Sequence, residues 1–292
     1  MTESNGGRLP GVEVCLNCGA GVAASAYCGA CGQRAVDLRI GVRGLVREAT
    51  SLVSSLDSKV LRTAWSLLAR PGLVAAEYIA GHRVRWVSPV RVFLGAVALY
   101  VLLGAAYAQR LAGGEELRGL AGQAAATAVR EGEPAAPAAE EPEPIVTKVE
   151  ALLDDLQRSM PTIMKVAFLL AAPGVILLLA LVELRRRRPL FDHAVTGLYL
   201  LSLVALAQLV KQPVGLALRA LADLPPLRAH LTANVAINAL FLVVFALWLR
   251  RVYDDRLAAA LGKALVLLVG LEVTIALGAA LISAIFAVVY IV

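Results

Sequence analysis

Long apolar blocks alternate with short charged segments along most of the chain. Five blocks approach or exceed about 20 residues, the length that lets a helix cross the hydrocarbon core of a bilayer. They lie at residues 90–109, 166–184, 194–210, 231–249 and 264–292. Arginine runs at 185–188 and 250–251 end the second and fourth blocks. The pattern predicts an all-α integral membrane protein with about five transmembrane helices.

Residues 37–89, ahead of the first block, carry apolar residues at helical spacing. A first stripe runs from Leu38 to Val60, with basic residues beside it, and a second helix carries Leu61, Trp65 and Leu68. We expect juxtamembrane amphipathic helices that lie on the membrane surface. The alternative is that they pack on the spans or on a partner protein. The basic aromatic run that follows predicts three headgroup-facing residues: Arg83, Arg85 and Trp86.

Residues 110–161 differ in composition from the rest of the chain. They are rich in Ala, Pro, Gly and Glu, with ten acidic and five basic residues between 110 and 160. Such a segment buries too little apolar surface to fold by itself. We expect a flexible, acidic external loop, with a helix returning over residues 145–156. Across the chain, 59% of residues are hydrophobic and 17% are charged, far from the usual soluble average of about 25% charged.

All four cysteines lie near the N-terminus, in two Cys-x-x-Cys-Gly repeats: Cys15, Cys18, Cys28 and Cys31. Such a turn directs two sulfurs at one point, and two turns supply the four ligands of a tetrahedral site. Residues 1–36 are therefore predicted to be a zinc ribbon with a structural zinc ion. Iron with four sulfur ligands remains an alternative, because its geometry is similar. Thiolate ligands and the lack of a visible signal peptide favour a reducing compartment.

The distribution of Lys and Arg predicts the orientation. With the N-terminus inside, the inner segments hold nineteen Lys and Arg and the outer segments hold nine. Short inner loops are enriched in these residues. We expect a multi-pass protein of the bacterial inner membrane with a cytoplasmic N-terminus and an external C-terminus. The net charge of +6 then reflects topology, and no nucleic-acid binding is expected.

A few polar residues fall in or beside the apolar blocks, where ionisable groups are costly and are candidates for function. They are Asp192, His193, Asn234, Asn238 and Glu272. One interpretation is structural: helix capping by Asp192, interhelical hydrogen bonds of the asparagines, and pairing of Glu272 with Lys263 or an arginine. The other is an intramembrane polar site for a proton, cation or polar substrate.

Between residues 15 and 95 the chain resembles a bacterial family of uncharacterised membrane proteins, catalogued only as a domain of unknown function. The shared elements are the cysteine repeats with Tyr27 and Gln33, Arg70-Pro71-Gly72, Tyr78, Gly81, Arg83 and Pro89. Asp192-His193 and Val252-Tyr253 match thinner elements further on. A second histidine common in the family is absent, and Leu198-Tyr199 stand in its region. The resemblance implies this architecture and brings no activity.

Three classes of function remain. The favoured class is a non-enzymatic protein whose zinc ribbon docks a cytosolic protein partner in an assembly, regulatory or scaffold role. The alternative is a transporter or channel-like carrier that uses the polar residues of the spans. A lipid-acting membrane enzyme is third, and no catalytic nucleophile or base for it is visible. We expect contact with membrane lipids and leave homo-oligomerisation open.

Overall fold

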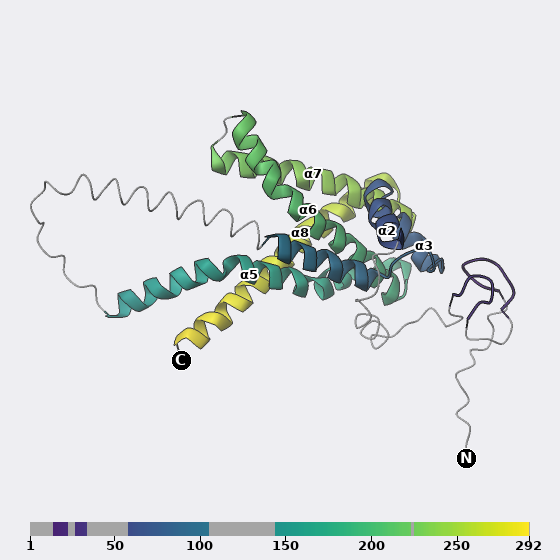
Figure 1. Ribbon diagram of the computed structural model, residues 1–292, viewed down its shortest axis with the longest axis horizontal. Helices are drawn as coiled ribbons and strands as arrows, with labels where there is room; N and C mark the ends of the chain where they lie inside the picture. The colour runs from purple at the N-terminus through teal and green to yellow at the C-terminus, as the bar shows by residue number, and fades with distance from the viewer. Residues whose placement is uncertain (1–13, 23–26, 34–57, 105–143, 223–224, 292) are drawn as a thin grey trace, which may run out of the picture. The chain divides into compact units, whose positions relative to one another are not determined.

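The computed structural model describes residues 14–22, 27–33, 58–104, 144–222 and 225–291 (Figure 1). Its helices are α2 (Ser58–Ala69), α3 (Leu73–Ala80), α5 (Pro144–Val182), α6 (Leu190–Ala222), α7 (Pro226–Tyr253) and α8 (Leu257–Ile291), with the short 3-10 helix η1 (Leu184–Arg186). A further helix covers Pro89–Gly104. The all-α fold class is confirmed.

Within the described residues, four helical segments are long and apolar enough to cross a membrane: Thr162–Val182, Leu190–Lys211, Leu231–Tyr253 and Leu257–Val288. They correspond to the second to fifth predicted spans. The first predicted span appears as the shorter apolar helix Pro89–Gly104, and residues 105–109 lie outside the described part. The protein is therefore a multi-pass membrane protein, with four helices that meet the length of a span by themselves.

Several boundaries differ from the predicted ones. Helix α5 begins at Pro144 and continues without interruption into the second span, so the helix that the sequence predicted over residues 145–156 of the external loop is longer than expected. The return helix was expected to end at residue 156. Most of the loop itself, residues 110–143, lies outside the described residues, as does the predicted stripe from Leu38 to Leu56.

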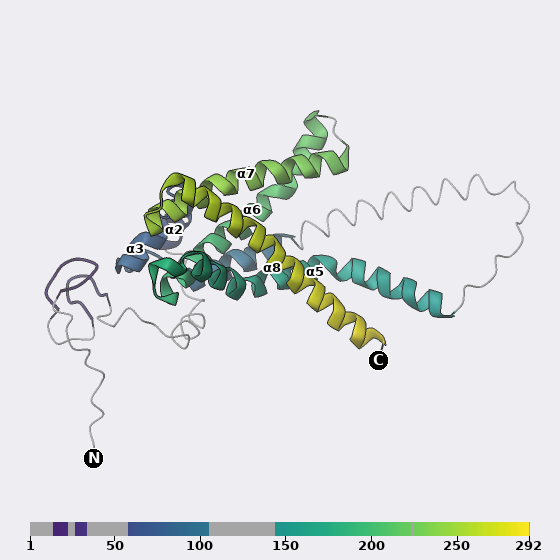
Figure 2. The ribbon, with the colours of Figure 1, turned by 180° about the vertical axis from the view of Figure 1, so that it is seen from behind.

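The chain forms two compact units, one of residues 1–97 with 171–274 and one of residues 98–170 with 275–292. In the first unit α6 is the central helix, because 67% of its apolar window is buried, against 33%, 28% and 22% for the other three. α6 and α7 run side by side (Figure 2). Trp248, Tyr199 and Leu201 are among the fully buried side chains of this unit.

Helices α2 and α3 pack on α6, and α3 also packs on α7. The turn between them needs Gly72, which adopts a left-handed φ of 77°. A Cβ at this position would lie 2.9 Å from the carbonyl oxygen of Trp248, so only glycine allows α3 to approach α7 this closely. Arg251 of α7 donates a hydrogen bond to the carbonyl of Pro71 in the same turn (3.0 Å). The pair α2–α3 is thus fixed to the membrane helices.

Candidate metal centre and its seat on the membrane helices

The two cysteine repeats fold into the same turn. In the first, the Gly19 N–H donates to the Cys15 carbonyl at 2.8 Å, and in the second the Gly32 N–H donates to the Cys28 carbonyl at 2.8 Å. Both glycines have a positive φ, 74° and 70°, which L side chains rarely adopt. The Cys-x-x-Cys-Gly pattern therefore dictates each knuckle locally.

The four sulfur atoms converge on one point. The Sγ atoms of Cys15 and Cys31 are 3.6 Å apart, as are those of Cys18 and Cys28, and all four lie within 4.8 Å of one another. A tetrahedral zinc ion with bonds of about 2.3 Å places its sulfur ligands about 3.8 Å apart. Each of these close pairs joins one knuckle to the other. The arrangement can hold one metal ion.

The crowding of the thiols also shapes their acidity. A hydrogen bond from the backbone of Ala20 lowers the pKa of the Cys18 thiol, but lost hydration and hydrogen bonds with the other three thiols raise it to about 12. Without a cation, four thiolates at this separation would repel one another. A bound metal ion would offset that repulsion and hold the sulfurs deprotonated.

The four-cysteine head, residues 14–22 and 27–33, rests on the loop after α3, which we call the seat (Gly81–Arg83). Gln33 makes two hydrogen bonds with it: Nε2 donates to the Gly81 carbonyl at 2.9 Å, and Oε1 accepts from the Arg83 N–H at 3.3 Å. A single amide side chain thus satisfies one acceptor and one donor of the seat. Gln33 directly follows the second knuckle, so the knuckle's position fixes the contact.

The first knuckle contacts the same seat. The ring of His82 lies 3.4 Å, Nδ1 to oxygen, from the Asn17 carbonyl. Leu16 packs on Gly81 so closely that an added Cβ would lie 2.8 Å from the Leu16 Cβ. Gly81 also ends α3 in a left-handed conformation with φ of 104°. Both knuckles therefore dock on one three-residue loop.

The seat is itself held by aromatic side chains. The Arg83 guanidinium lies 5.1 Å from the ring centre of Tyr78 and 5.0 Å from that of Phe191 in α6. Tyr78 packs edge-on against Tyr199 of α6, with ring centres 6.1 Å apart. The Tyr199 hydroxyl donates to the Val87 carbonyl at 2.6 Å. These contacts connect the head, through the seat, to the central membrane helix.

Two of the three residues predicted to face headgroups have partners inside the protein. Trp86 is buried, and its Nε1 donates to Glu77 at 2.8 Å. Arg83 packs between the aromatic rings described above. Arg85 is exposed and forms an ion pair with Glu77 at 3.5 Å. Of the three, only Arg85 has the exposure that a headgroup contact needs, and that contact stays a prediction.

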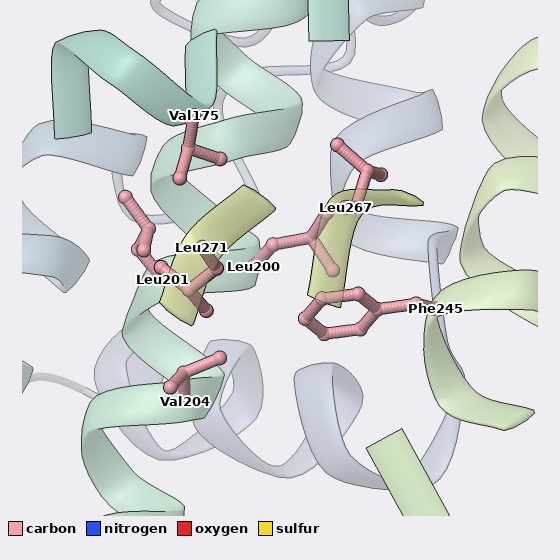
Figure 3. Close-up of a pocket in the computed structure, with 7 residues that line it drawn as sticks. All are labelled: Val175, Leu200, Leu201, Val204, Phe245, Leu267 and Leu271. Atoms are coloured by element: carbon pink, nitrogen blue, oxygen red, sulfur yellow. The ribbon is translucent and has the colours of Figure 1, made fainter. Parts of the chain in front are cut away.

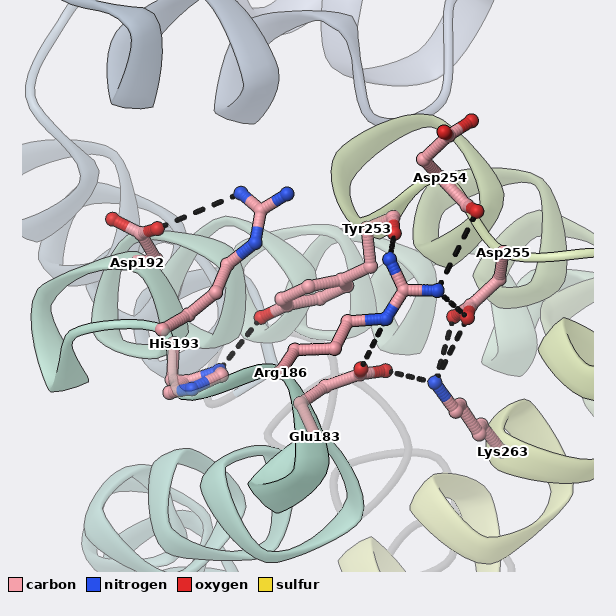
Figure 4. A network of polar contacts seen from close by, with 9 residues as sticks. Glu183, Arg186, Asp192, His193, Tyr253, Asp254, Asp255 and Lys263 are labelled. Carbon is pink, nitrogen blue, oxygen red and sulfur yellow. Dashed lines mark hydrogen bonds and ion pairs between the residues drawn. The ribbon is translucent and has the colours of Figure 1, made fainter.

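A network of charged side chains joins the connections at one end of the helices, which we call the short-loop end (residues 183–189 and 254–256; Figure 4). The Lys263 ammonium donates to Glu183 at 2.6 Å and to both oxygens of Asp255 at 2.9 and 3.0 Å. Arg186 donates to Asp255 at 2.8 Å and to the Tyr253 carbonyl. Two acids and two bases make the network neutral and tie α5, α7 and α8 together.

Burial controls the acidity of Glu183, the first residue past the apolar segment Thr162–Val182. Its side chain is fully buried. Burial raises the pKa of this carboxyl, and the hydrogen bond from Lys263 lowers it; Asp255 raises it and the charges of Lys263 and Arg186 lower it. Glu183 therefore depends on Lys263 to keep its charge.

Asp192 and His193 lie beside this network. The His193 Nδ1 is 2.9 Å from the Tyr253 hydroxyl, and the two rings stack with centres 5.7 Å apart. Asp192 lies in the first turn of α6 and pairs with Arg188 at 3.6 Å. A carboxylate in the first turn also complements the helix dipole. These contacts fit the structural interpretation of the two residues.

The remaining polar candidates lie elsewhere. Asn234 and Asn238 are on α7, nineteen and fifteen residues before Tyr253, which places them about 28 and 23 Å from it along the helix. Glu272 is exposed on α8 and lies close enough to Lys211 of α6 to interact electrostatically. Its expected partner Lys263 is engaged by Glu183 and Asp255 instead. The structure does not bring the five candidates together.

One apolar pocket lies between the helices of the first unit (Figure 3). Its volume is about 10 Å³, about what one water molecule requires. It is lined only by apolar side chains: Val175, Leu200, Leu201, Val204, Phe245, Leu267 and Leu271. The pocket offers no polar group to a solute.

Sequence reasoning overlooked Glu183 and Asp255, the two acids of the network. Both had a visible signal. Glu183 lies two residues before the four arginines 185–188, and Asp255 lies four residues after Arg251, which ends the fourth block. A carboxylate at the end of an apolar block, beside bases that would otherwise be unpaired, indicates such a network.

The structure thus defines a multi-pass, all-helical membrane protein with a four-cysteine cluster that can hold a metal ion. Residues 57–101 match the family DUF3667, described as a protein of unknown function. The match covers α2, α3, the seat and most of the helix that begins at Pro89. No curated protein and no solved structure matches the chain.

Proposed function

We propose that this chain is a non-enzymatic protein of the bacterial inner membrane whose zinc-bound head recruits a cytosolic protein partner. The observation that carries the proposal is the docking of both knuckles on the seat. A head attached in this way presents a rigid surface at a fixed place on the membrane. Val14 and Tyr27 of the head are 54% and 55% exposed and offer apolar contact area to a partner.

Zinc is the metal that we propose for the head. The sulfur separations match a tetrahedral zinc site, and thiolates suit this ion. The described head has few buried apolar side chains besides Cys15 and Cys28. Metal binding would therefore supply most of its folding free energy, about 10–16 kcal/mol by comparison with zinc-finger peptides.

The arrangement of basic residues supports a cytoplasmic N-terminus. The seat contacts Phe191 at the start of α6, and Arg251 contacts the α2–α3 turn. The head therefore lies at the same end of its unit as the arginines of 185–188 and 250–251. Positive residues concentrate in short cytoplasmic loops, and thiolate sites persist in reducing compartments. Both arguments favour the same side for the head.

Transport has less support. The polar candidates of the spans are spread along α6, α7 and α8, and the apolar pocket between these helices in the first unit is too small for a solute. Asp192 and His193 are engaged by Arg188 and Tyr253. These contacts are those of a fixed helix end, whereas a carrier needs polar groups that converge near the middle of the membrane.

The test places a photo-crosslinking amino acid at Tyr27 in the full chain in native membranes. We expect a discrete crosslinked partner, identified by mass spectrometry, that is absent when the same crosslinker replaces Leu257, an exposed residue at the start of α8. The double variant Cys15→Ser/Cys18→Ser is expected to lose both the zinc and the crosslink. Metal analysis should find one zinc ion per wild-type chain.

The variant Val14→Ser separates the surface from the metal. It retains all four cysteines, so zinc content should be unchanged while the yield of crosslinked partner falls severalfold. An equal yield from wild type and the cysteine variant would contradict a zinc-dependent docking role. A wild-type protein that purifies without stoichiometric metal would contradict the zinc assignment.

A further inference from the structure

Helix α2 turns its apolar stripe outward. Leu61, Trp65 and Leu68 are 75%, 72% and 57% exposed. Their spacing of four and three residues places them on one face of the helix. The side chains buried against the protein are Thr63, Ser66 and Leu67. A helix of a water-soluble protein shows the reverse pattern, so this outer face is suited to apolar surroundings.

The position of α2 along the membrane helices indicates what those surroundings are. The Thr63 hydroxyl accepts from the Val87 N–H at 3.1 Å, two residues before the helix that starts at Pro89. The Val87 carbonyl in turn accepts from Tyr199, nine residues into α6 and about 14 Å from its start.

The turn after α2 gives a depth on a second helix. Gly72 lies against Trp248, five residues before the end of α7, which corresponds to about 8 Å. A hydrocarbon core is about 30 Å thick, with polar regions on both sides. Both depths are less than half of that thickness, so the pair α2–α3 lies beside the half of the spans nearest the short-loop end, on the side of one leaflet.

The charge of the segment adds a second indication. Residues 58–72 contain three basic residues, Lys59, Arg62 and Arg70, and no acidic residue. All three are exposed. Each basic side chain near an anionic membrane surface contributes about 1 kcal/mol to binding. An outward stripe with a tryptophan, bordered by bases, is the composition of an interfacial helix.

We propose that α2 is an interfacial anchor: its Leu61–Trp65–Leu68 stripe inserts into one leaflet, and its basic residues bind anionic phospholipid headgroups. The anchor sets the level of the seat at the membrane surface, because Thr63 connects α2 to Val87 and the seat lies between Tyr78 and Trp86. This role is independent of the identity of any partner of the head.

The three tryptophans of the chain provide the test. Trp86 and Trp248 are buried, whereas Trp65 is exposed. For the test, the full chain is to be reconstituted into vesicles of phosphatidylcholine and phosphatidylglycerol. These lipids carry bromine on the upper part of the acyl chain. The difference in emission between wild type and Trp65→Phe isolates the Trp65 signal. Bromolipid is expected to quench most of that signal, and aqueous acrylamide little of it.

Matched variants test the two parts of the anchor. Leu61→Ser/Leu68→Ser removes apolar stripe residues and is expected to reduce quenching by bromolipid and increase quenching by acrylamide. The triple variant Lys59→Gln/Arg62→Gln/Arg70→Gln removes the bases. It is expected to abolish the difference in Trp65 quenching between vesicles with and without phosphatidylglycerol. The thermal midpoint of each variant in detergent reports whether the fold is retained.

Two outcomes would overturn the proposal. Strong quenching of Trp65 by acrylamide and none by bromolipid would place the stripe in water. Protection from both quenchers would mean that protein covers it, either residues 34–57 of this chain or a second molecule. Equal quenching of the wild type with and without phosphatidylglycerol would overturn the assignment of anionic headgroups to the bases.

Discussion

At the scale of single residues, Gly81 has a structural role that no other residue type could fill. Its φ of 104° ends α3, and a Cβ would lie 2.8 Å from the Cβ of Leu16 in the head. The left-handed conformation costs other residues about 1–2 kcal/mol before any clash. The steric part of the effect arises from the head, which is far away in sequence, and so only the structure shows it.

We predict that Gly81→Ala loosens the head from its seat. The strain and the contact with Leu16 together should lower the free energy of unfolding by at least about 1–2 kcal/mol. A chelator should also remove the metal severalfold faster, because the docked knuckles lose their support. The measurements are the thermal midpoint in detergent and the rate of zinc release to a coloured chelator.

Two variants separate the causes of this effect. Gly262→Ala in α8 meets nothing within 4 Å and should leave both measurements unchanged or slightly improved. Adding Leu16→Gly to Gly81→Ala removes the Leu16 Cβ that the new methyl group would meet, and should recover the steric part of the loss and not the conformational part. Unchanged zinc release in Gly81→Ala would contradict the docking of the head on the seat.

At the scale of elements, Thr63 connects α2 to the start of the first apolar helix. The side chain is fully buried, its hydroxyl donates to the Lys59 carbonyl at 2.7 Å and accepts from the Val87 N–H at 3.1 Å. Apolar periodicity predicted helix α2 and favoured the membrane surface for its Leu61–Trp65–Leu68 side, with packing on the spans or on a partner as the alternative. A polar residue on the inner face determines which side of the helix meets the protein.

We predict that Thr63→Val destabilises the protein although the two side chains have nearly the same shape. The Val87 N–H would be left buried without its acceptor, which costs about 1–3 kcal/mol. Thr63→Ser keeps the hydroxyl and should lose less. Thermal unfolding in detergent compares the three proteins. Equal stability of the wild type and the valine variant would show that the hydroxyl does not hold α2 in place.

Element boundaries were the least predictable part of the fold. The sequence predicted that the returning helix of the loop ends at residue 156, yet α5 runs through Pro161 and Pro173 to Val182. Likewise α6 starts at Leu190, four residues before the predicted third span, and continues past Pro213 to Ala222. Long membrane helices accommodate proline because neighbouring helices satisfy the freed backbone groups. That compensation is absent from the local sequence.

At the scale of the whole molecule, the network of Glu183, Arg186, Asp255 and Lys263 joins the ends of three long helices. The local pair of Glu183 and Arg186 (3.5 Å) is joined by contacts between distant segments, Lys263 with Glu183 at 2.6 Å and Arg186 with Asp255 at 2.8 Å. Removing one member of a buried network leaves an uncompensated charge, which typically costs about 3–5 kcal/mol. The network therefore holds the short-loop end together while contributing no net charge.

We predict that Lys263→Met destabilises the protein in a pH-dependent way. The folded-state pKa of Glu183 is already raised by burial, and losing Lys263 raises it further. Folding then favours the protonated carboxyl, so stability is highest below the ordinary pKa near 4.5 and falls as the pH rises through the folded value. The loss of stability relative to wild type, measured as the drop in thermal midpoint, should be largest at pH 8 and shrink toward pH 5.

The variant Glu183→Gln/Lys263→Met serves as the control, because it removes the titrating group together with its partner. Its thermal midpoint should differ from that of wild type by a similar amount at both pH values. A deficit of Lys263→Met that is equal at pH 5 and pH 8 would mean that Glu183 does not depend on Lys263 for its charge.

The sequence by itself determined the features that depend on local physics. Apolar length predicted the long helices, and the Cys-x-x-Cys-Gly repeats predicted a four-sulfur cluster, because both follow from residues that are adjacent in the chain. Only the tertiary structure decided which polar residues meet. Lys263 reaches Glu183 rather than Glu272, and Gln33 reaches Gly81, because these contacts depend on how separate helices pack, and no local pattern encodes that packing.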